Sequence, residues 1–241
     1  MLVLEKLPIA HTFFDNHASS QLDPDFIHSY IASEQTAGRY SEAFTPNTLE
    51  SVIGPFRTSP LGLVPKPHSN KLRLVQDMSF PRSNPNIMSV NAGVNSDDFP
   101  TSWGTFDSTA ELILSLPPGC VAATFDISAA YRLTPIHPDQ QHALCIFWDG
   151  AVYVDRAVMF SLTSSAGVFG AIADMLVAIY GAANFGLIRK WVDNFLAIWL
   201  PHQSWSEQEF MDLTGYFGVP WSMESFTLLP PSRDTSVLTG T

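Results

Sequence analysis

The sequence predicts an α+β fold with helices packed on one face of an antiparallel sheet. Residues 121–125 form a short apolar run with the length of a buried strand. The segments 143–159 and 188–200 each place turn residues between two strand-like runs, which is typical of β-hairpins. A helical pattern at 169–180 follows the first hairpin and another from Ser206 onward follows the second, and this order is typical of α+β proteins.

Composition places this 241-residue chain among globular proteins, because 46% of its residues are hydrophobic and 15% are charged. The formal net charge of −11 by itself argues against nucleic-acid binding, since nucleic-acid-binding proteins usually neutralise phosphates with a basic surface. The charge is unevenly distributed. Residues 56–82 carry five basic side chains and one acidic side chain, whereas residues 83–241 carry five basic and fifteen acidic ones. A short basic segment therefore lies within an acidic protein.

The cysteine content and the N-terminal sequence indicate an intracellular protein. Cys120 and Cys145 are too few to build the disulfide framework of a secreted domain. The first 20 residues lack a basic region followed by an apolar run, which is the pattern of a secretory signal. We therefore expect a location in the cytoplasm or the nucleus, and no disulfide partner.

Two helices are predicted in the acidic N-terminal region, which we interpret as an adaptor to the main domain. Asp23 followed by proline is a helix cap, and Gly38 is a stop for the helix. Thr45 followed by proline repeats this pattern, with Gly54 as the stop.

The basic segment predicts a β-hairpin from 61–66 and 71–75 whose exposed positions are basic. Residues 108–111 have the pattern of a capping box for a helix that ends at Leu116.

Asp126 and Asp193 are the pair of residues most suited to carry chemistry. Each follows an apolar strand-like run, so the two carboxylates would emerge side by side if their strands are neighbours. Two close carboxylates repel each other unless a cation lies between them. Mg²⁺ suits this place, because it is usually held by one or two carboxylates together with substrate phosphate oxygens. By spacing alone, two ordinary aspartates that cap turns remain the alternative.

One segment has the hydrophobicity of a membrane span. Between residues 157 and 188 the charged residues are limited to Asp174, which would lie near the middle of the bilayer. Several serines, threonines and glycines dilute this stretch, so we expect a buried helix of a soluble core and no membrane partner.

The motifs around the two aspartates resemble those of reverse transcriptases. Residues 125–132, 160–169 and 191–196 are similar in order and spacing to three motifs of the palm. Residues 61–66, 71–77 and 89–91 are similar to the fingers of the same family. The likeness is greatest to the polymerases of retrotransposons, particularly fungal elements and elements that integrate with a tyrosine recombinase.

This resemblance covers about residues 56–221 and implies a right-hand polymerase with fingers and palm. The implied organisation is an acidic helical extension (1–55), a fingers-like segment (56–120), a palm-like segment (121–221) and an irregular tail (222–241). The palm would hold an antiparallel sheet with helices on one face. No thumb is evident in the sequence of the tail, so we expect primer and template to be held weakly.

In this family two Mg²⁺ ions, or Mn²⁺ ions in their place, align a primer hydroxyl with the α-phosphate of a nucleotide. The resemblance implies that Asp126 and Asp193 bind these ions and that the Ile127 carbonyl adds a ligand. The family normally carries a second aspartate at the position of Asn194. Asparagine is neutral and a weaker metal ligand, so this catalytic position is altered.

The resemblance also implies a set of nucleotide-binding residues. Tyr131 matches the steric gate that stacks under the sugar and excludes a 2′-hydroxyl group. Lys66 and Arg73 match the fingers residues that bind the triphosphate, for which the arginine fork and the lysine ammonium are suited. The turn at Ser164 and Ser165 would let the following helix approach the nascent base pair.

These expectations define the function. The chain would add deoxynucleotides (dNTPs) to a primer on an RNA or DNA template by two-metal phosphoryl transfer. The alternative is a catalytically inactive relic of a retroelement that keeps the fold and weak nucleic-acid binding. A membrane or interaction protein built around residues 157–188 is the third hypothesis.

Overall fold

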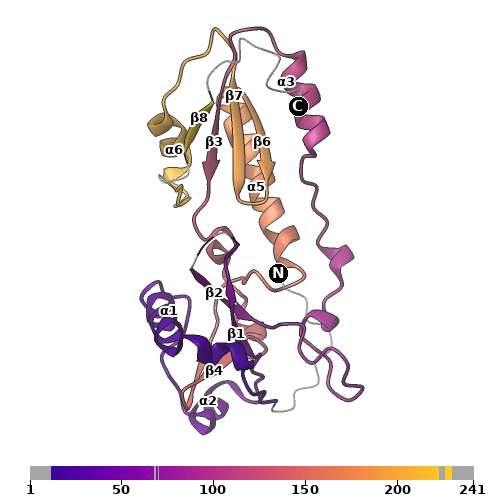
Figure 1. Ribbon diagram of the computed structural model, residues 1–241, viewed down its shortest axis with the longest axis vertical. Helices are drawn as coiled ribbons and strands as arrows, with labels where there is room; N and C mark the ends of the chain where they lie inside the picture. Colours follow the sequence, from indigo (N-terminus) through magenta and orange to yellow (C-terminus); the bar gives the residue numbers. More distant parts are fainter. Residues whose placement is uncertain (1–11, 68, 70, 223–225, 230–241) are drawn as a thin grey trace. The chain divides into compact units, whose positions relative to one another are not determined.

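The structure is a computed structural model that describes residues 12–67, 69, 71–222 and 226–229 (Figure 1). The chain divides into two compact units, each built from separate segments. Unit 1 comprises Met1–Phe99 and Tyr131–Ser165, and unit 2 comprises Pro100–Ala130 and Ala166–Thr241. Both contain helices and small antiparallel sheets, which confirms the α+β class.

Unit 1 contains two β-hairpins and several short helices. The elements are η1 (Ala18–Leu22), α1 (Pro24–Thr36), α2 (Pro46–Ile53), β1 (Leu61–Pro65), β2 (Leu72–Gln76), η2 (Asn91–Gly93), η3 (Ser96–Asp98), η4 (Ala130–Leu133), α4 (Pro138–Gln141), β4 (Cys145–Trp148) and β5 (Ala151–Val154). The pairs β1–β2 and β4–β5 are antiparallel, as the sequence predicts. Ile27 and Ile31 of α1 join Leu61 and Leu63 of β1 in one buried cluster, so the N-terminal helix is part of this core.

The helix caps agree with the sequence at most ends. The Asp23 side chain accepts a hydrogen bond from the Phe26 backbone N–H and begins α1, and Thr45 begins α2 in the same way. The predicted cap at Ser108 is wrong. Thr105 is the N-cap of α3 (Phe106–Ser115), and Ser108 is its partner in the capping box. Serine serves in either role, so the three-residue spacing fits both registers.

Unit 2 contains a four-stranded antiparallel sheet in the order β6-β7-β3-β8 (Figure 1). The strands are β3 (Val121–Asp126), β6 (Leu187–Trp191), β7 (Asn194–Trp199) and β8 (Thr227–Leu229), and the helices are α3, α5 (Ser165–Ala182) and α6 (Glu207–Gly215). The hairpin predicted at 188–200 is confirmed. The sequence predicts an irregular tail at 222–241, and this is wrong at β8, which pairs with β3 at Thr124↔Thr227, Ala123↔Leu228 and Ala122↔Leu229. Residues 223–225 and 230–241 of this tail lie outside the described residues. Three residues without turn signals are too short a strand to recognise from sequence.

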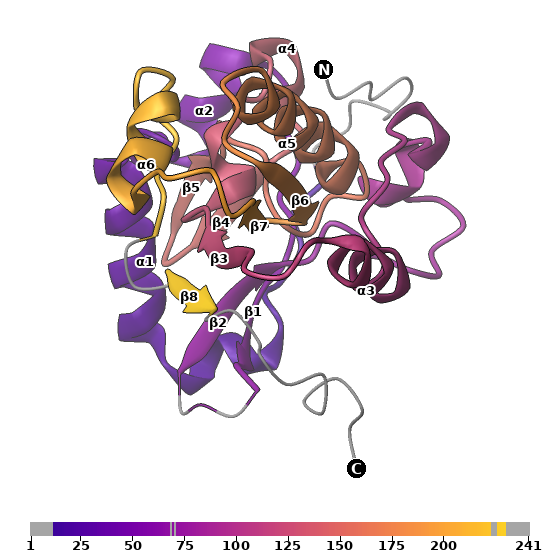
Figure 2. The same ribbon diagram turned by 90° about the horizontal axis from the view of Figure 1, so that it is seen from above.

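One face of this sheet carries the core of unit 2. Phe125 of β3 and Phe195 of β7 lie opposite each other and are buried. The Phe125 ring stacks on Phe210 of α6 with a centroid distance of 3.9 Å, and Phe210 stacks on Tyr180 of α5 at the same distance. Both helices therefore contribute to the same side of the sheet, and Figure 2 shows α5 lying along β6 and β7. The placement of these two helices on one face is as predicted.

Helix α5 is longer than the predicted helix at 169–180 and lies against the sheet. By length and composition alone, α5 could also cross a membrane. It is the one helix among the described residues that is long and apolar enough to do so. It nevertheless buries Phe169, Ala173, Leu176 and Tyr180 in unit 2. The buried Lys190 of β6 donates a hydrogen bond to the Gly170 carbonyl (2.9 Å) and forms an ion pair with Asp174 (2.6 Å). These contacts are those of a core helix that is tied to the neighbouring strand.

Gly186, just before β6, is a position where a side chain is not tolerated. Its φ of +85° is left-handed, and an added Cβ would lie 2.2 Å from the Ile198 carbonyl oxygen of β7. We expect Gly186→Ala to lower the free energy of unfolding by at least about 1–3 kcal/mol, the usual size of such backbone strain. Gly181→Ala is the control, because a Cβ at this position of α5 meets nothing within 4 Å. Urea denaturation should find this control unchanged or slightly stabilised, and equal effects would contradict the argument.

Candidate active site

The two predicted aspartates come together where β3 ends and the β6–β7 turn begins. Asp126, the last residue of β3, lies directly opposite Asn194, the first residue of β7. Asp193 lies in the turn immediately before Asn194, and Val192 beside it has a left-handed φ of 56° that closes this tight turn. Asp126 and Asp193 are partly buried, whereas Asn194 is exposed. Adjacent antiparallel strands therefore place these three residues at one edge of the sheet.

The backbone at Asp126 and Ile127 is held from two sides. The Ile127 N–H donates to the Asp193 carbonyl at 3.0 Å, which couples the two acidic positions directly. On the other side the Ser222 N–H donates to the Asp126 carbonyl at 2.7 Å, and the Ser128 N–H donates to the Pro220 carbonyl at 2.9 Å. Ile127 is buried, so its own side chain anchors the segment in the core. The end of β3 is thus a well-braced position for a functional carboxylate.

The segment 220–222 is a part of the site that the sequence does not reveal. Trp221 donates from Nε1 to Thr214 Oγ1 of α6 at 2.9 Å, and its ring contacts Phe125 and Phe195 edge-on. The aromatic packing of Trp221 thereby fixes the strand-like bridge between Trp221 and Ile127. A proline followed by tryptophan has no local pattern that would indicate such a role.

Asn194 changes the charge of the site. Its Nδ2 donates a hydrogen bond to Asp193 Oδ1 at 3.2 Å, which an aspartate at this position cannot do. The Asn194 amide N–H therefore stabilises the Asp193 carboxylate. The amide oxygen of Asn194 remains available to a metal ion, but only as a neutral ligand. A second carboxylate here would instead repel Asp193 unless a cation were bound.

The donor set fits a divalent cation that substrate helps to hold. Within the described residues no group of three or more His, Cys, Asp or Glu side chains could enclose a metal ion. Asp126 and Asp193 provide two carboxylates, and the remaining donors are amide or carbonyl oxygens. Hard oxygen donors of this number suit Mg²⁺, which keeps waters and takes further oxygens from substrate phosphates. They do not suit zinc, for which structural sites use four cysteine or histidine ligands.

In unit 1 the predicted nucleotide-binding cations share one face of the β1–β2 hairpin. Arg73 lies opposite Val64, and the Lys66 N–H donates to the Lys71 carbonyl at 2.8 Å, which continues the register beyond the strands. Leu61 and Leu63, on the other face, are buried. The alternation therefore places Lys66, Lys71 and Arg73 together on the exposed face, and all three are exposed. The prediction that the exposed positions of this hairpin are basic is confirmed at these three residues, but Val64 on the same face is also exposed.

Ser164 and Ser165 lie at the start of α5, and both are buried. Ser165 Oγ donates to the Met159 carbonyl at 2.5 Å, so this serine closes the turn that precedes the helix. Because both side chains are buried, they shape the turn from within. Their assignment as nucleotide-binding residues stays a prediction.

Asn91, the first residue of η2, contacts this turn and is a residue that sequence reasoning missed as a functional residue. Its Nδ2 donates to the Ser161 carbonyl and its Oδ1 accepts from the Thr163 N–H, at 2.8 and 2.9 Å. A third bond joins Nδ2 to Ser79 Oγ at 2.8 Å. One side chain therefore connects the segment after β2 with the turn at 161–163. The only sequence signal is that Asn91 belongs to a fingers-like motif.

Tyr131 lies in η4 and contacts the same turn. Its ring packs edge-on against Phe160, with centroids 5.2 Å apart and an interplanar angle of 67°. Phe160 is 71% exposed, so one side of this aromatic pair faces solvent. The structure thus brings Tyr131 and the turn at 160–165 together in unit 1, whereas the hairpin cations form a separate group on β1 and β2.

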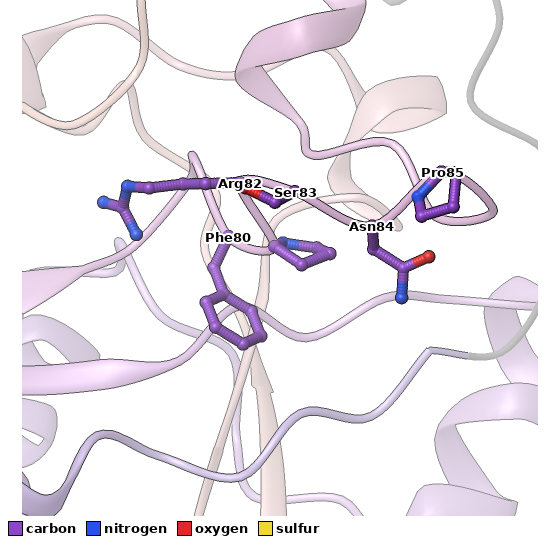
Figure 3. A pocket seen from close by; sticks show the side chains of 6 residues that line it. Phe80, Arg82, Ser83, Asn84 and Pro85 are labelled. Atoms are coloured by element: carbon purple, nitrogen blue, oxygen red, sulfur yellow. The ribbon is translucent and has the colours of Figure 1, made fainter.

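A hollow of about 510 Å³ occurs in the loop after β2 (Figure 3). It is lined by residues 80–85, and none of the predicted site residues is among them. Figure 3 shows the Arg82 side chain extending away from Asn84 and Pro85. Arg82 donates two hydrogen bonds to Asp77, at 2.8 and 3.0 Å. Burial alone would raise the pKa of Asp77, but the hydrogen bonds from Arg82 and from the His17 ring outweigh burial and hold this pKa below its usual value. The arginine charge is therefore already compensated, and this hollow adds nothing to the candidate site.

Comparison with known proteins gives structural neighbours only. No family model matches the sequence, and no curated protein matches it. The foamy viral protease-reverse transcriptase in complex with RNA/DNA hybrid matches with a TM-score of 0.61 and 18% identity, over 94% of this chain and 26% of that one. The same enzyme in complex with dsDNA matches with a TM-score of 0.60 and 18% identity, over 94% and 40%. The native enzyme of prototype foamy virus gives 0.56 and 15%, over 90% and 25%.

The chain spans between a quarter and two fifths of the length of these neighbours. At this level of identity the likeness concerns the fold. It agrees with the resemblance of the motifs, two of which, 125–132 and 191–196, contain the strand ends and the turn that bring Asp126 and Asp193 together. The protein has a reverse-transcriptase-like fold.

Proposed function

We propose that this chain is an RNA-directed DNA polymerase domain of retrotransposon origin, with residues 56–120 as fingers and 121–221 as palm. It adds deoxynucleotides to a primer by metal-dependent nucleotidyl transfer. One observation carries the proposal: in a reverse-transcriptase-like fold, Asp126 and Asp193 meet at the end of two adjacent strands. The origin rests on the likeness of the motifs to those of fungal elements and of elements with a tyrosine recombinase.

The two carboxylates act as metal ligands in this proposal. Bound Mg²⁺ or Mn²⁺ supplies Lewis-acid activation of the primer hydroxyl and neutralises charge on the phosphate. Asp126 and Asp193 hold the metal, and Ile127 contributes its carbonyl oxygen. Asn194 keeps the Asp193 carboxylate in place through its amide hydrogen bond of 3.2 Å. The bracing of Asp126 and Ile127 by Asp193 and Ser222 limits reorganisation of these ligands during the reaction.

The residues of unit 1 bind the nucleotide. The exposed face of the β1–β2 hairpin offers Lys66 and Arg73 to a triphosphate, and Lys71 adds a third cation on the same face. Three like charges on one face repel each other, and a bound polyanion relieves that repulsion. Tyr131 contacts the sugar and selects deoxynucleotides. Ser164 and Ser165 complete the nucleotide site through the turn that they shape beside Tyr131, and Asn91 holds that turn.

Primer-template nucleic acid is the proposed partner, and two of the compared structures are complexes with dsDNA or an RNA/DNA hybrid. A net charge of −11 predicts that binding is weak, because few basic side chains are available to displace counterions from phosphates. The proposed place of action is the cytoplasm or nucleus, without a membrane partner.

A primer-extension assay tests the proposal. The chain is incubated with a labelled primer on an RNA or a DNA template, dNTPs, and Mg²⁺ or Mn²⁺ at low salt. We expect extension on the RNA template that requires the metal and stops when EDTA is added. Absence of extension under all conditions, by a chain that is folded by circular dichroism, would contradict the proposal.

The second candidate is a non-catalytic relic that keeps the fold and binds nucleic acid weakly. Asn194 favours it, because the site then has one carboxylate fewer than the family motif. The Asn194→Asp variant separates the two candidates. Polymerase activity that rises in this variant supports a catalytic site with a weakened metal ligand. A wild type and a variant that are both inert, although both are folded and bind primer-template, support the relic.

The same variant has a predicted effect on stability. Without metal, Asn194→Asp loses the hydrogen bond to Asp193 and gains a like charge, so we expect a loss of about 1 kcal/mol in the free energy of unfolding. Mg²⁺ should reverse this loss, since a ligand at 100 times its Kd adds about 2.7 kcal/mol. Thermal unfolding in EDTA and in excess Mg²⁺ measures both effects. The exposed Asn86→Asp is the control, and a Mg²⁺ response equal to that of the control would argue against a metal site.

A further inference from the structure

A cluster of four charged side chains, three of them almost fully buried, lies beside Tyr131. Arg132 donates from Nε and Nη2 to Glu34 Oε2, at 3.1 and 2.7 Å, and from Nη1 to Asp155 Oδ2 at 2.8 Å. Arg39 donates two further bonds to the same Glu34, at 2.7 and 2.6 Å. Two cations therefore satisfy two carboxylates in a closed network that links α1, η4 and the end of β5.

The network is too well buried to be a surface ion pair. The side chains of Glu34, Arg132 and Asp155 are 6%, 11% and 1% exposed. Burial alone would raise the pKa of Glu34, but its bonds to Arg39 and Arg132 outweigh burial and hold that pKa below its usual value. Glu34 is therefore ionised at neutral pH and fully engaged. A charge held this way fixes the position of its partner guanidinium.

Arg132 fixes both sides of the aromatic contact that Tyr131 makes. Arg132 is the next residue after Tyr131 within η4, so holding its guanidinium holds this single turn of helix. Its Nη1 also donates to the Ala157 carbonyl at 2.9 Å. Ala157 begins the short stretch that leads to Phe160, the ring against Tyr131. The Val158 N–H donates to the Thr134 carbonyl at 2.8 Å and joins the same two segments a second time.

Glu34 makes the N-terminal helix a part of this arrangement. We predict from sequence that residues 1–55 are an adaptor, but α1 supplies a carboxylate that holds Arg132 directly. A helix that served only as an adaptor would have no reason to bury a charge against η4. Removal of the Glu34 charge leaves Arg132 with Asp155 as its carboxylate partner and removes two of the hydrogen bonds that orient η4.

We propose that Glu34 and Arg132 are positioning residues that hold the Tyr131 ring against Phe160 and thereby set discrimination between deoxyribonucleotides and ribonucleotides. The inference rests on the proposed polymerase function, in which Tyr131 contacts the sugar. It assigns to the N-terminal helix a role in substrate selection. Neither Glu34 nor Arg132 touches the nucleotide, and both act through the backbone of η4 and of residues 157–160.

The test compares incorporation of one dNTP and the matching ribonucleotide, as a ratio of kcat/KM values. The variants are Glu34→Gln, which keeps the side-chain size but removes the charge, and Arg132→Lys, which keeps the charge but cannot form the same fork of bonds. We expect the ratio to fall tenfold or more in Glu34→Gln and less in Arg132→Lys. Tyr131→Ala sets the scale, because it removes the ring itself.

A destabilised control separates positioning from loss of stability. Leu49→Ala leaves a cavity in a buried cluster of α2 and β5 that contains no member of the charge network. We expect this variant to unfold at a lower temperature and to keep the wild-type ratio. Suppose that Tyr131→Ala loses selectivity but Glu34→Gln keeps the wild-type ratio of kcat/KM values for dNTP and ribonucleotide. This result would overturn the inference and leave the proposed function standing. Absence of extension by wild type would overturn the proposed function and the inference with it.

Discussion

Substitution of Asp126 by asparagine is expected to abolish primer extension without unfolding the protein. The substitution removes one of the two carboxylates, and a neutral amide binds a hard divalent cation poorly. Metal-ion stabilisation of phosphoryl transfer is worth several kcal/mol, so the rate should fall by roughly 1000-fold or more. The fold should persist, because the hydrogen bonds that brace this position are made by backbone atoms of Asp126, Ile127 and Ser222.

Asp97→Asn is the matched control for this prediction. Asp97 is exposed in η3 of unit 1 and takes no part in the candidate site, so its substitution removes the same charge elsewhere in the chain. Its extension rate should stay within a factor of two of wild type. Equal rates in Asp126→Asn and wild type would show that extension comes from a contaminant or that the carboxylate pair has no catalytic role.

Substitution of Arg132 by methionine is expected to cost about 3–5 kcal/mol, the usual result of removing one partner from a buried ion pair. Methionine replaces much of the volume but leaves the buried Asp155 without its arginine and removes two of the four hydrogen bonds to Glu34. A loss of this size is a large part of the stability of most domains. Urea denaturation with far-ultraviolet circular dichroism measures it.

Arg156→Met is the control for the arginine. Arg156 is exposed, and the hydrogen bonds that it makes in the described part of the chain use its backbone. We expect a change of less than about 0.5 kcal/mol, as for most surface substitutions. A loss below 1 kcal/mol in Arg132→Met would mean that the network contributes little and that η4 is held by its neighbours.

Local sequence signals predict much of the fold because they act over a few residues. The Asp149-Gly150 turn places β4 against β5, and proline after Asp23 or Thr45 begins a helix. The same kind of signal fails at α3, where Thr105 and Ser108 both satisfy the capping pattern. The helix is present as predicted, but its N-cap lies three residues earlier than the predicted cap.

The candidate site is predictable where it depends on strand ends and not where it depends on distant partners. Asp126 and Asp193 each follow an apolar strand, and antiparallel pairing of these strands brings them together. The contact of Arg132 with Glu34 joins residues 98 positions apart, and no local pattern indicates such a pair. Asn91, which contacts Ser161 across 70 positions, is hidden for the same reason. Long-range polar contacts depend on tertiary packing, which a single sequence does not display.

The most direct test of the account is the binding of Mn²⁺ to the carboxylate pair. Electron paramagnetic resonance measures free Mn²⁺ during titration of the chain together with primer-template and a dNTP. We predict saturable binding by wild type that weakens at least tenfold in Asp126→Asn and in Asp193→Asn, and that is unchanged in Asp97→Asn. Mn²⁺ affinity that is equal in wild type and both site variants would contradict the claim that Asp126 and Asp193 form a metal site.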